Sequence, residues 1–335
     1  SCSTSICRPR MSSSTSSSDP FRLLLRALGF GACVGALLLV ALYFGPHASR
    51  VDYMGAVAAK HARLRSLPSP KVVIIGGSNA AFGMDSERLG KALCRPVVNM
   101  SIHASLGFKF MVEEVKAELD NGDLVIAALE HSGYSKPVKD NDLHILTVDR
   151  FPEALGFVPW TTRPRLVLGV GVMRLQAAWK VLSGAWKDDS PAPVYRASGF
   201  NGEGDLVSHL GLPAVDPDAV ERTEYHAPII ASEFWSIAQE LADSVKAHKG
   251  ELVFILPAIA RSSYRPDVDR TIRIALAEHG YTVLGTEGNN VQPDSSFHDT
   301  HYHLRSVGRQ LRTATLIEDL CRSGTVQCCP GGEGP

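Results

Sequence analysis

The sequence lacks the features that usually mark a nucleic-acid-binding, zinc-binding or thiol-redox protein. Its 35 acidic and 34 basic side chains nearly cancel, so no strongly basic field favours nucleic acid. None of the seven cysteines forms a Cys-x-x-Cys pair, which argues against a zinc knuckle or a thioredoxin-like motif. Cys94 and Cys321 are candidates for a disulfide if the domain lies in an oxidising compartment. Cys328 and Cys329 fall in a Gly- and Pro-rich tail, residues 323–335, that we expect to be disordered.

One long hydrophobic run stands near the start of the chain. Residues 27–44 carry no charge, and their length is at the lower end of what a membrane-spanning helix needs. Four basic residues precede the run: Arg8, Arg10, Arg22 and Arg26. The positive-inside rule then places the N-terminus in the cytoplasm and the rest of the chain outside. We therefore expect a disordered segment (1–20), an inner-membrane single-pass anchor (21–45), a stalk (46–70) and an extracytoplasmic, periplasmic domain.

A signal peptide and a core helix are the alternatives to an uncleaved anchor. A cleaved signal peptide needs a small-x-small site directly after the apolar run, and residues 45–49 supply a poor one. A buried core helix rarely follows four arginines. The anchor therefore remains our prediction.

From residue 71 onward, short β-branched runs alternate with patterns of helical period. Expected strands are residues 71–76, 97–99, 124–129, 251–256 and 281–284. Expected helices are residues 85–93, 106–119, 232–248, 267–279 and 306–320. This alternation predicts a doubly wound parallel α/β sheet.

Residues 135–228 interrupt the alternation as a helical insertion. Within it, residues 164–186 show the apolar spacing of a helix, with Trp179 and Trp186 seven residues apart on one face. Large aromatic side chains at such spacing usually pack in a core or cap, and we expect that here. Contact with the bilayer is the alternative.

Gly76-Gly77-Ser78-Asn79 directly follows the first expected strand. Ligands and catalytic groups collect at the carboxyl ends of parallel strands. Glycines beside a serine let the backbone turn sharply, so that the hydroxyl and a free N–H point into one cavity, as a nucleophile requires. A plain strand-to-helix turn and a phosphate-binding loop are the alternatives, but the glycine spacing fits neither nucleotide fingerprint.

A second polar block, residues 297–304, precedes the last expected helix. A serine alcohol needs a base, and the base needs an orienting carboxylate. Asp299 and His303 are four residues apart, close enough to meet within one turn, and the chain order Ser, Asp, His suits a hydrolase. Metal binding by His298, His301 and His303 is the alternative.

Taken together, Gly-Gly-Ser-Asn at 76–79 and Asp-Thr-His-Tyr-His-Leu at 299–304 resemble the SGNH (GDSL-like) hydrolase superfamily. The chain looks closest to the membrane-anchored envelope proteins related to alginate-type O-acetylation factors. Weaker matches are Asn99, Gly122-Asp123, Phe200-Asn201-Gly202, Gly204-Asp205 and Arg312-Thr313. The resemblance implies a flavodoxin-like three-layer fold, SGNH hydrolase-like, over residues 71–322, with no cofactor and no metal.

Position by position, the resemblance implies Ser78 as nucleophile, His303 as general base and Asp299 as its orienting partner. The family's second block supplies a backbone amide to the oxyanion hole, and here the N–H of Ser101 is the candidate. In place of the third block's Gly-x-Asn-Asp, this chain has Glu130-His131-Ser132-Gly133. Candidate replacements for the missing asparagine are His131, His103 and Asn79, and losing one such donor costs about 100- to 1,000-fold in rate.

These features predict a serine esterase or O-acyltransferase that acts on an acylated envelope glycan, or on a small ester, through an acyl-enzyme. Expected partners are the membrane, through residues 27–44, and envelope polysaccharide machinery, but no nucleic acid. The alternative is a non-catalytic glycan-binding or assembly module of an exopolysaccharide system with the same fold. A cytoplasmic dinucleotide-binding protein is a third possibility, and it requires residues 27–44 to pack inside the domain.

Overall fold

A five-stranded parallel sheet forms the centre of the protein. The computed structural model describes residues 20–47, 53–135, 141–186, 194–213 and 229–329. The sheet contains β1 (Val72–Gly76), β2 (Val97–Asn99), β3 (Leu124–Ala128), β4 (Glu251–Phe254) and β6 (Thr282–Val283). Their spatial order is β2-β1-β3-β4-β6, and every pairing is parallel. The predicted mixed α/β architecture with a parallel sheet is confirmed.

The register of β1 and β3 sets the position of the candidate nucleophile. Val72 pairs with Leu124, and Gly76 pairs with Ala128 at the carboxyl end. Ser78 and Glu130 each follow that last pair by two residues, so the two side chains leave the sheet next to each other. The central strands are buried on both faces, as their β-branched composition predicts.

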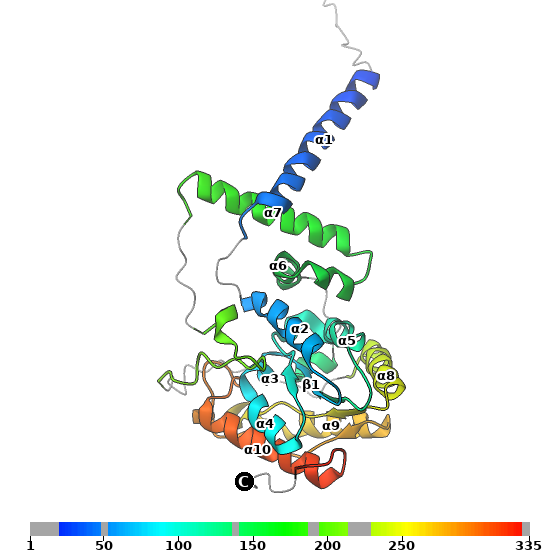
Figure 1. Ribbon diagram of the computed structural model, residues 1–335, viewed down its shortest axis with the longest axis vertical. Coiled ribbons are helices and arrows are strands. Elements are labelled where there is room, and N and C mark those ends of the chain that lie inside the picture. The colour runs from blue at the N-terminus through cyan, green and yellow to red at the C-terminus, as the bar shows by residue number, and fades with distance from the viewer. Residues whose placement is uncertain (1–19, 48–52, 136–140, 187–193, 214–228, 330–335) are drawn as a thin grey trace, which may run out of the picture.

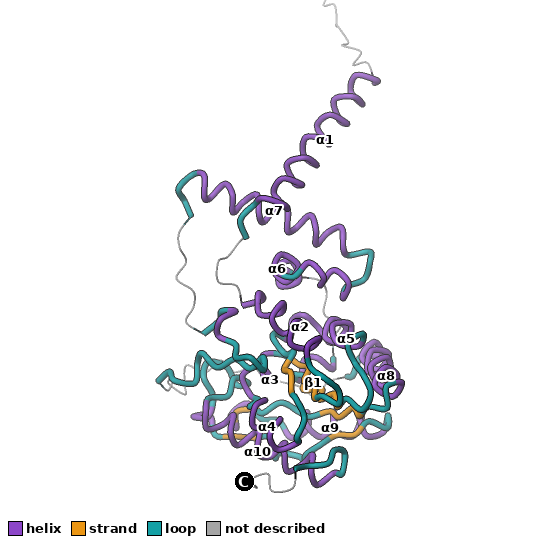
Figure 2. Tube along the Cα trace, in the orientation of Figure 1, coloured by secondary structure: helices purple, strands orange, loops and turns teal. Residues whose placement is uncertain are grey.

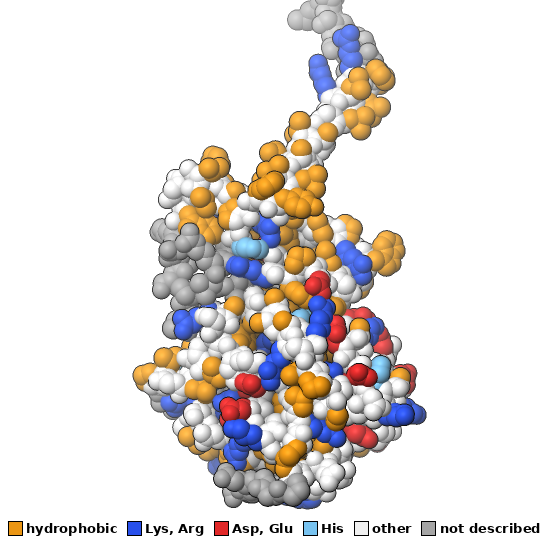
Figure 3. Space-filling view, viewed as in Figure 1, with side chains coloured by type: hydrophobic (Ala, Val, Ile, Leu, Met, Phe, Trp, Pro, Cys, Tyr) orange, Lys and Arg blue, Asp and Glu red, His pale blue; other side chains and the backbone are white. Residues whose placement is uncertain are grey.

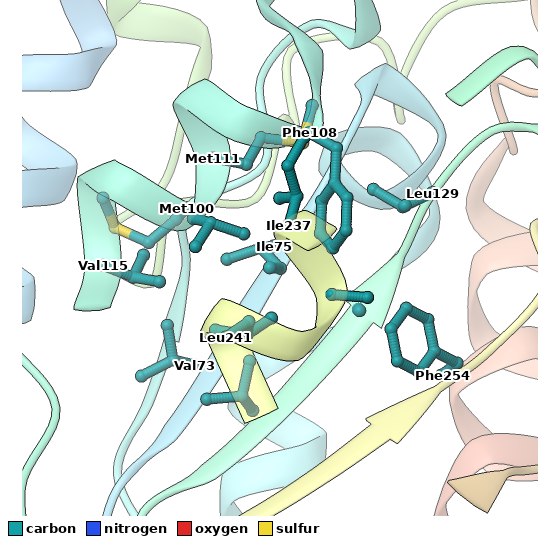
Figure 4. Packing of buried hydrophobic residues seen from close by; sticks show 14 of the residues in the cluster. Val73, Ile75, Met100, Phe108, Met111, Val115, Leu129, Ile237, Leu241 and Phe254 are labelled. Atoms are coloured by element: carbon teal, nitrogen blue, oxygen red, sulfur yellow. The ribbon is translucent and has the colours of Figure 1, made fainter. Parts of the chain in front are cut away.

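Helices cover both faces of the sheet (Figures 1 and 2). Alternate residues of β1 point to opposite layers because side chains alternate along a strand. Val73 and Ile75 pack with α5 (Gly107–Lys116), α8 (Ser232–Ala247) and α9 (Pro266–Glu278), as Figure 4 shows in part. Val72 and Ile74 pack against the opposite layer, which is formed by α3 (Ser78–Gly83), α4 (Ser86–Leu93) and α10 (Ser306–Ser323).

The described residues between β3 and α8 are mainly helical. They include η3 (His131–Tyr134), α6 (Asp142–Arg150), η4 (Pro152–Phe157), α7 (Arg163–Leu182) and η5 (Ala197–Gly199). Residues 136–140, 187–193 and 214–228 of the expected insertion lie outside the described residues.

Residues expected to form a stalk instead belong in part to the folded domain. The short helix η1 (Tyr53–Gly55) and the following α2 (Ala56–Ser66) bury Met54, Val57 and Leu64 against the insertion and the sheet. The polar composition of α2 predicts an exposed helix. In the structure Lys60 and His61 are buried, because each bonds to a partner from a distant part of the chain that the sequence does not reveal.

An apolar helix, α1 (Pro20–Phe44), extends away from the α/β body (Figure 1). By length and composition it can cross a membrane, and Ala41 is its buried residue. A helix this exposed does not form part of the domain core. The expected disordered segment, residues 1–20, lies outside the described residues except for Pro20.

Two disulfides correct the predicted pairing of Cys94 with Cys321. Cys94 is bonded to Cys329, and Cys321 is bonded to Cys328, with Cα–Cα distances of 5.6 Å and 5.7 Å. The expectation of a disordered tail had removed the two partners from consideration. Ser323 is the last residue of α10, and residues 324–329 follow it and are fastened to α4 and α10 by these bonds, whereas residues 330–335 lie outside the described part.

Candidate active site

Ser78 is the first residue of α3, immediately after the carboxyl end of β1. Gly77 connects the two elements, and a Cβ at this position would lie 2.5 Å from Glu130 Oε1 and 2.9 Å from Ala104 Cβ. The glycine is therefore required for close approach of two neighbouring loops. It keeps the Ser78 backbone against the end of β3.

The Glu130 carboxylate accepts a hydrogen bond from the hydroxyl of Ser78. Ser78 Oγ donates to Glu130 Oε1 at 3.1 Å, and the backbone N–H of Asn79 donates to the same oxygen at 3.3 Å. Burial raises the pKa of Glu130, while the charge of His303 and the hydrogen bonds from Asn79 and Ser78, including the Ser78 backbone N–H, oppose that rise. One carboxylate oxygen thus accepts from both the Ser78 hydroxyl and the Asn79 backbone N–H.

Asp299 and His303 form the predicted pair. His303 Nδ1 lies 2.7 Å from Asp299 Oδ1, and Tyr195 donates its hydroxyl to the other carboxylate oxygen. Burial by itself would raise the pKa of Asp299, but the hydrogen bonds from His303 and Tyr195 and the His303 charge lower it to about 2. The carboxylate stays ionised and fixes the ring through Nδ1, which leaves Nε2 as the nitrogen for proton transfer.

A compact loop carries this pair. Phe297 and Leu304 form an isolated antiparallel bridge, and the N–H of His298 donates to the carbonyl of His303 at 2.7 Å. A small parallel ladder of β5 (Ile259–Ala260) and β7 (Val291–Gln292) flanks the loop, and Ala260 N–H donates to His301 O at 3.1 Å. These backbone bonds place His303 independently of its side-chain contacts.

Ser78 and His303 converge on one face of α3. The His303 ring stacks on Phe82, with centroids 3.9 Å apart and planes within 5°. Phe82 follows Ser78 by four residues on the same helix, so the two side chains share a face. Among the described residues, no hydrogen bond joins Ser78 to His303, because the serine hydroxyl donates to Glu130 instead. The structure therefore brings Ser78, Asp299 and His303 together without completing the serine–histidine contact.

The expected oxyanion donors have other partners. The N–H of Ser101 donates to Asn99 Oδ1 at 3.1 Å, and the side-chain amide of Asn79 donates to Ala128 O at 3.0 Å. His131 Nδ1 lies 2.6 Å from the hydroxyl of Tyr302, and burial lowers the pKa of His131 to about 4. Each of these groups is held in place by the partners named here.

His103 lies closer to the histidine side of the site. Its Nδ1 accepts from the backbone N–H of Ser105 at 3.1 Å. Burial first, and the nearby charge of His303 second, lower the pKa of His103. A neutral imidazole near His303 is the arrangement that this charge favours.

Tyr195 is a site residue that sequence reasoning did not identify. Its hydroxyl contacts Asp299 and lies 3.2 Å from His303 Nδ1, and its ring packs 5.8 Å from Phe82. Tyr195 comes from the end of the insertion, where no motif or period marked it. Only the tertiary fold reveals it.

A buried ionic network supports the loops around the site. Asp205 is fully buried and accepts from Ser86 Oγ at 2.6 Å, Asn99 Nδ2 at 2.9 Å and Arg309 Nη2 at 2.9 Å. Gly204 beside it has a φ of +94°, and a Cβ there would lie 2.3 Å from Asn99 O. The Gly204-Asp205 landmark thus holds the end of β2 against α4 and α10.

Lys60 secures the same region from α2. Its Nζ donates to Asn99 O at 2.7 Å and to Ser101 O at 2.9 Å, and burial lowers its pKa to about 7. The sequence predicts a stalk at this position, whereas in the structure Lys60 holds the loop that follows β2.

The histidine cluster that suggested a metal alternative does not form a ligand set in the part of the chain that the structure covers. There, no group of three or more His, Cys, Asp and Glu side chains is placed to hold a metal ion. His298 lies against His209, with ring centroids 5.6 Å apart. His303 is committed to Asp299. No family model and no curated protein matches this chain.

Proposed function

We propose that this chain is a serine esterase or O-acyltransferase that works through an acyl-enzyme on Ser78. The observation that carries the proposal is the Asp299–His303 pair at 2.7 Å, with the imidazole stacked on the helix that begins at Ser78. A carboxylate, an imidazole and a hydroxyl meet at one edge of a parallel sheet. That set of groups is what nucleophilic acyl transfer requires.

The sheet order supports a flavodoxin-like fold, as the SGNH resemblance implies. The order β2-β1-β3-β4-β6 corresponds to the doubly wound arrangement 2-1-3-4-5, whose strand order reverses between β1 and β3. Ser78 follows β1 and Glu130 follows β3. The candidate nucleophile therefore lies at the switch point where such folds bind ligands.

In the proposed reaction, His303 Nε2 removes the proton of Ser78 Oγ as the oxygen attacks the ester carbonyl. A carbon–oxygen bond forms to Ser78, and the tetrahedral oxyanion collapses with departure of the alcohol, which receives the proton from His303. Water or a sugar hydroxyl then attacks the acyl-enzyme, with His303 again as base. Asp299 stabilises the imidazolium in both steps.

The contact with Glu130 has to be released before this reaction begins. The Ser78 hydroxyl must turn from Glu130 to His303, and the carboxylate must withdraw or be neutralised for an oxyanion to occupy the backbone donors. The raised pKa of Glu130 lowers the cost of neutralising it. The described arrangement is thus a resting state of the proposed enzyme.

The proposed location is the inner membrane, with α1 as a single-pass anchor and the α/β body outside the cytoplasm. The apolar length of α1 and the arginines that precede it support this topology. The two disulfides support an oxidising compartment, since cytosolic thiols are usually kept reduced. An acylated envelope glycan as substrate follows from the resemblance to envelope O-acetylation proteins.

Labelling of the detergent-solubilised full chain by a fluorophosphonate tests the covalent step. Wild type is expected to be labelled, Ser78→Ala is expected to lose the label, and Ser105→Ala, a serine on the neighbouring loop, is expected to retain it. Equal labelling of wild type and Ser78→Ala, or no labelling of either, would contradict a nucleophilic Ser78.

The Glu130 contact also favours a second candidate, a non-catalytic glycan-binding or assembly module. A carboxylate that satisfies Ser78 and its neighbouring amide leaves no empty oxyanion hole in the resting state. This candidate predicts that an acylated oligosaccharide binds in a calorimetric titration without being deacylated, and that Ser78→Ala binds equally well. Release of the acyl group by wild type alone would decide for the enzyme.

A further inference from the structure

Helix α7 carries apolar side chains on two opposite faces. Leu166 and Val170 are buried in a cluster with residues of α6 and the body, and Ala177 is buried on the same face. A second stripe at alternating spacings of four and three residues lies about 140–220° around the helix from the first. It consists of the exposed Leu168, Val172, Trp179 and Leu182 and the half-buried Leu175. Trp179 is 71% exposed and Leu182 is 83% exposed, so the core packing expected for Trp179 is wrong. The described residues of the domain leave this stripe uncovered, and exposed apolar patches of this kind usually mark a contact with a partner or a membrane.

The end of α1 that enters the domain packs on a neighbouring face of α7. A Cβ on Gly171 would lie 3.0 Å from Leu38 Cδ2, so the small residue permits close approach of the two helices. Arg174 donates to the carbonyl of Leu42 and pairs with Asp149 of α6 at 2.6 Å. Figure 1 shows α7 lying across the end of α1, between α1 and the rest of the molecule.

The exposed stripe continues the apolar surface of α1. A groove of about 520 Å³ between the two helices is lined by Leu38 and Leu42 of α1, by Trp160, and by Arg163, Pro164, Val167 and Leu168 at the start of α7. Figure 3 shows hydrophobic side chains along α1 and around its junction with α7, whereas charged side chains gather on the body. The surface that faces lipid on a membrane-spanning α1 therefore extends onto the start of α7, with the charge of Arg163 at its border.

The charges of α7 suit a phospholipid surface. Its twenty residues include no Asp or Glu, and the exposed Arg163, Arg165 and Lys180 flank the apolar stripe. Tryptophan beside leucine and valine, with cations at the border, is typical of helices that lie in the membrane interface.

We infer that α7 lies flat in the bilayer interface as a second membrane contact, with the Leu168–Leu182 stripe among the acyl chains and its cations near lipid phosphates. This inference rests on the proposed membrane-spanning role of α1. A second copy of the chain is the less favoured occupant, because the stripe is continuous with the lipid-facing surface of α1. The contact fixes the tilt of the α/β body relative to the membrane.

Depth-dependent fluorescence quenching tests this placement in the full chain. Replacing Trp160, Trp186 and Trp235 by Phe leaves Trp179 as the single fluorophore, and an equivalent chain keeps only Trp235, which stacks on His279 in the body. Both are reconstituted into phosphatidylcholine–phosphatidylglycerol vesicles with phosphatidylcholine brominated near the carboxyl or the methyl end of its chains. Bromine near the carboxyl end is expected to quench Trp179 more strongly, and neither lipid is expected to quench Trp235.

A third chain reports on α1 separately. It carries Phe30→Trp, near the middle of α1, with the four native tryptophans replaced by Phe, and bromine near the methyl end is expected to quench it most. Quenching at position 30 without quenching of Trp179 would overturn the α7 contact with lipid. In that case a blue-shifted Trp179 emission, the sign of an apolar environment, would indicate a protein partner instead. Absence of quenching at both positions would overturn the contact and the anchor together. Matching circular dichroism spectra show that all three chains are folded.

Discussion

Replacing Glu130 by glutamine is expected to accelerate the reaction of Ser78. The substitution keeps the size of the side chain and removes the negative charge beside Ser78 Oγ and the Asn79 N–H. An oxyanion bound to those backbone donors would lie about 4 Å from the carboxylate, where two like charges repel by about 4 kcal/mol at an effective dielectric constant near 20. Since about 1.4 kcal/mol corresponds to a tenfold change in rate, removing the charge is worth up to about 1,000-fold.

The gain should depend on pH. Burial raises the pKa of Glu130, so a falling pH neutralises the carboxylate of the wild type as it passes through that raised value. The ratio of variant to wild-type rate is therefore largest at high pH and shrinks as the pH falls.

The assay is the pseudo-first-order rate of fluorophosphonate labelling across pH, supplemented by hydrolysis of p-nitrophenyl acetate. Glu130→Asp is the matched control, because it keeps the charge while shortening the side chain, and it should gain much less than Glu130→Gln. Slower labelling of Glu130→Gln than of wild type would refute the reasoning. It would mean that the carboxylate itself takes the proton of Ser78.

Three further predictions follow from the geometry of the site and its supports. Asp299→Asn should reduce the labelling rate by about 1,000- to 10,000-fold, because the amide no longer selects the productive imidazole tautomer. The pKa of Asp299 is lowered from 3.8 in the unfolded chain to about 2 in the folded protein. The ionised carboxylate therefore stabilises the fold fully above pH 3.8, and this stabilisation is lost as the pH falls toward 2. Because the carboxylate is partly exposed and screened by water, wild type should exceed this variant by only about 1 kcal/mol in unfolding free energy at pH 6, and denaturation curves should converge near the acid limit. Gly204→Ala should lower the unfolding free energy by about 3 kcal/mol, because φ is +94° and the methyl group would meet Asn99 O. The control, Gly202→Ala, has open space around it and should be nearly neutral. Equal melting temperatures of the two variants would contradict this account. Removing the Cys94–Cys329 bond by double alanine substitution should lower the unfolding free energy by about 2–5 kcal/mol. The loss should exceed that from removing Cys321–Cys328, because the first bond joins residues 235 positions apart and the second joins residues 7 positions apart. Thermal melts of the two double variants give the comparison.

Local patterns allowed the sheet and half of the candidate site to be predicted. The strand Val97–Asn99 was predicted with its observed bounds, because a β-branched run flanked by turn residues is a local signal. Asp299 and His303 are separated by four residues, so their pairing depends on one loop. Both features need little knowledge of the rest of the fold.

What could not be predicted depends on contacts between distant segments. Glu130 meets Ser78 because β1 and β3 pair with Gly76 opposite Ala128, and periodicity does not specify that register. Tyr195 arrives from the insertion without a motif, and Lys60 from a helix whose polar face suggested a stalk. The partner of Cys94 was missed because the glycine- and proline-rich composition of the tail indicated disorder.

The Cys94–Cys329 bond also makes the domain a closed covalent ring from which the Ser78 segment projects. Asp299 and His303 lie within the ring, whereas Ser78 precedes it. A single peptide cleavage anywhere between residues 95 and 320 opens the ring but leaves both fragments attached through sulfur. Such a nicked chain keeps the serine and the histidine in one molecule, migrates as a single species without reductant, and separates into two fragments only after the Cys94–Cys329 disulfide is reduced.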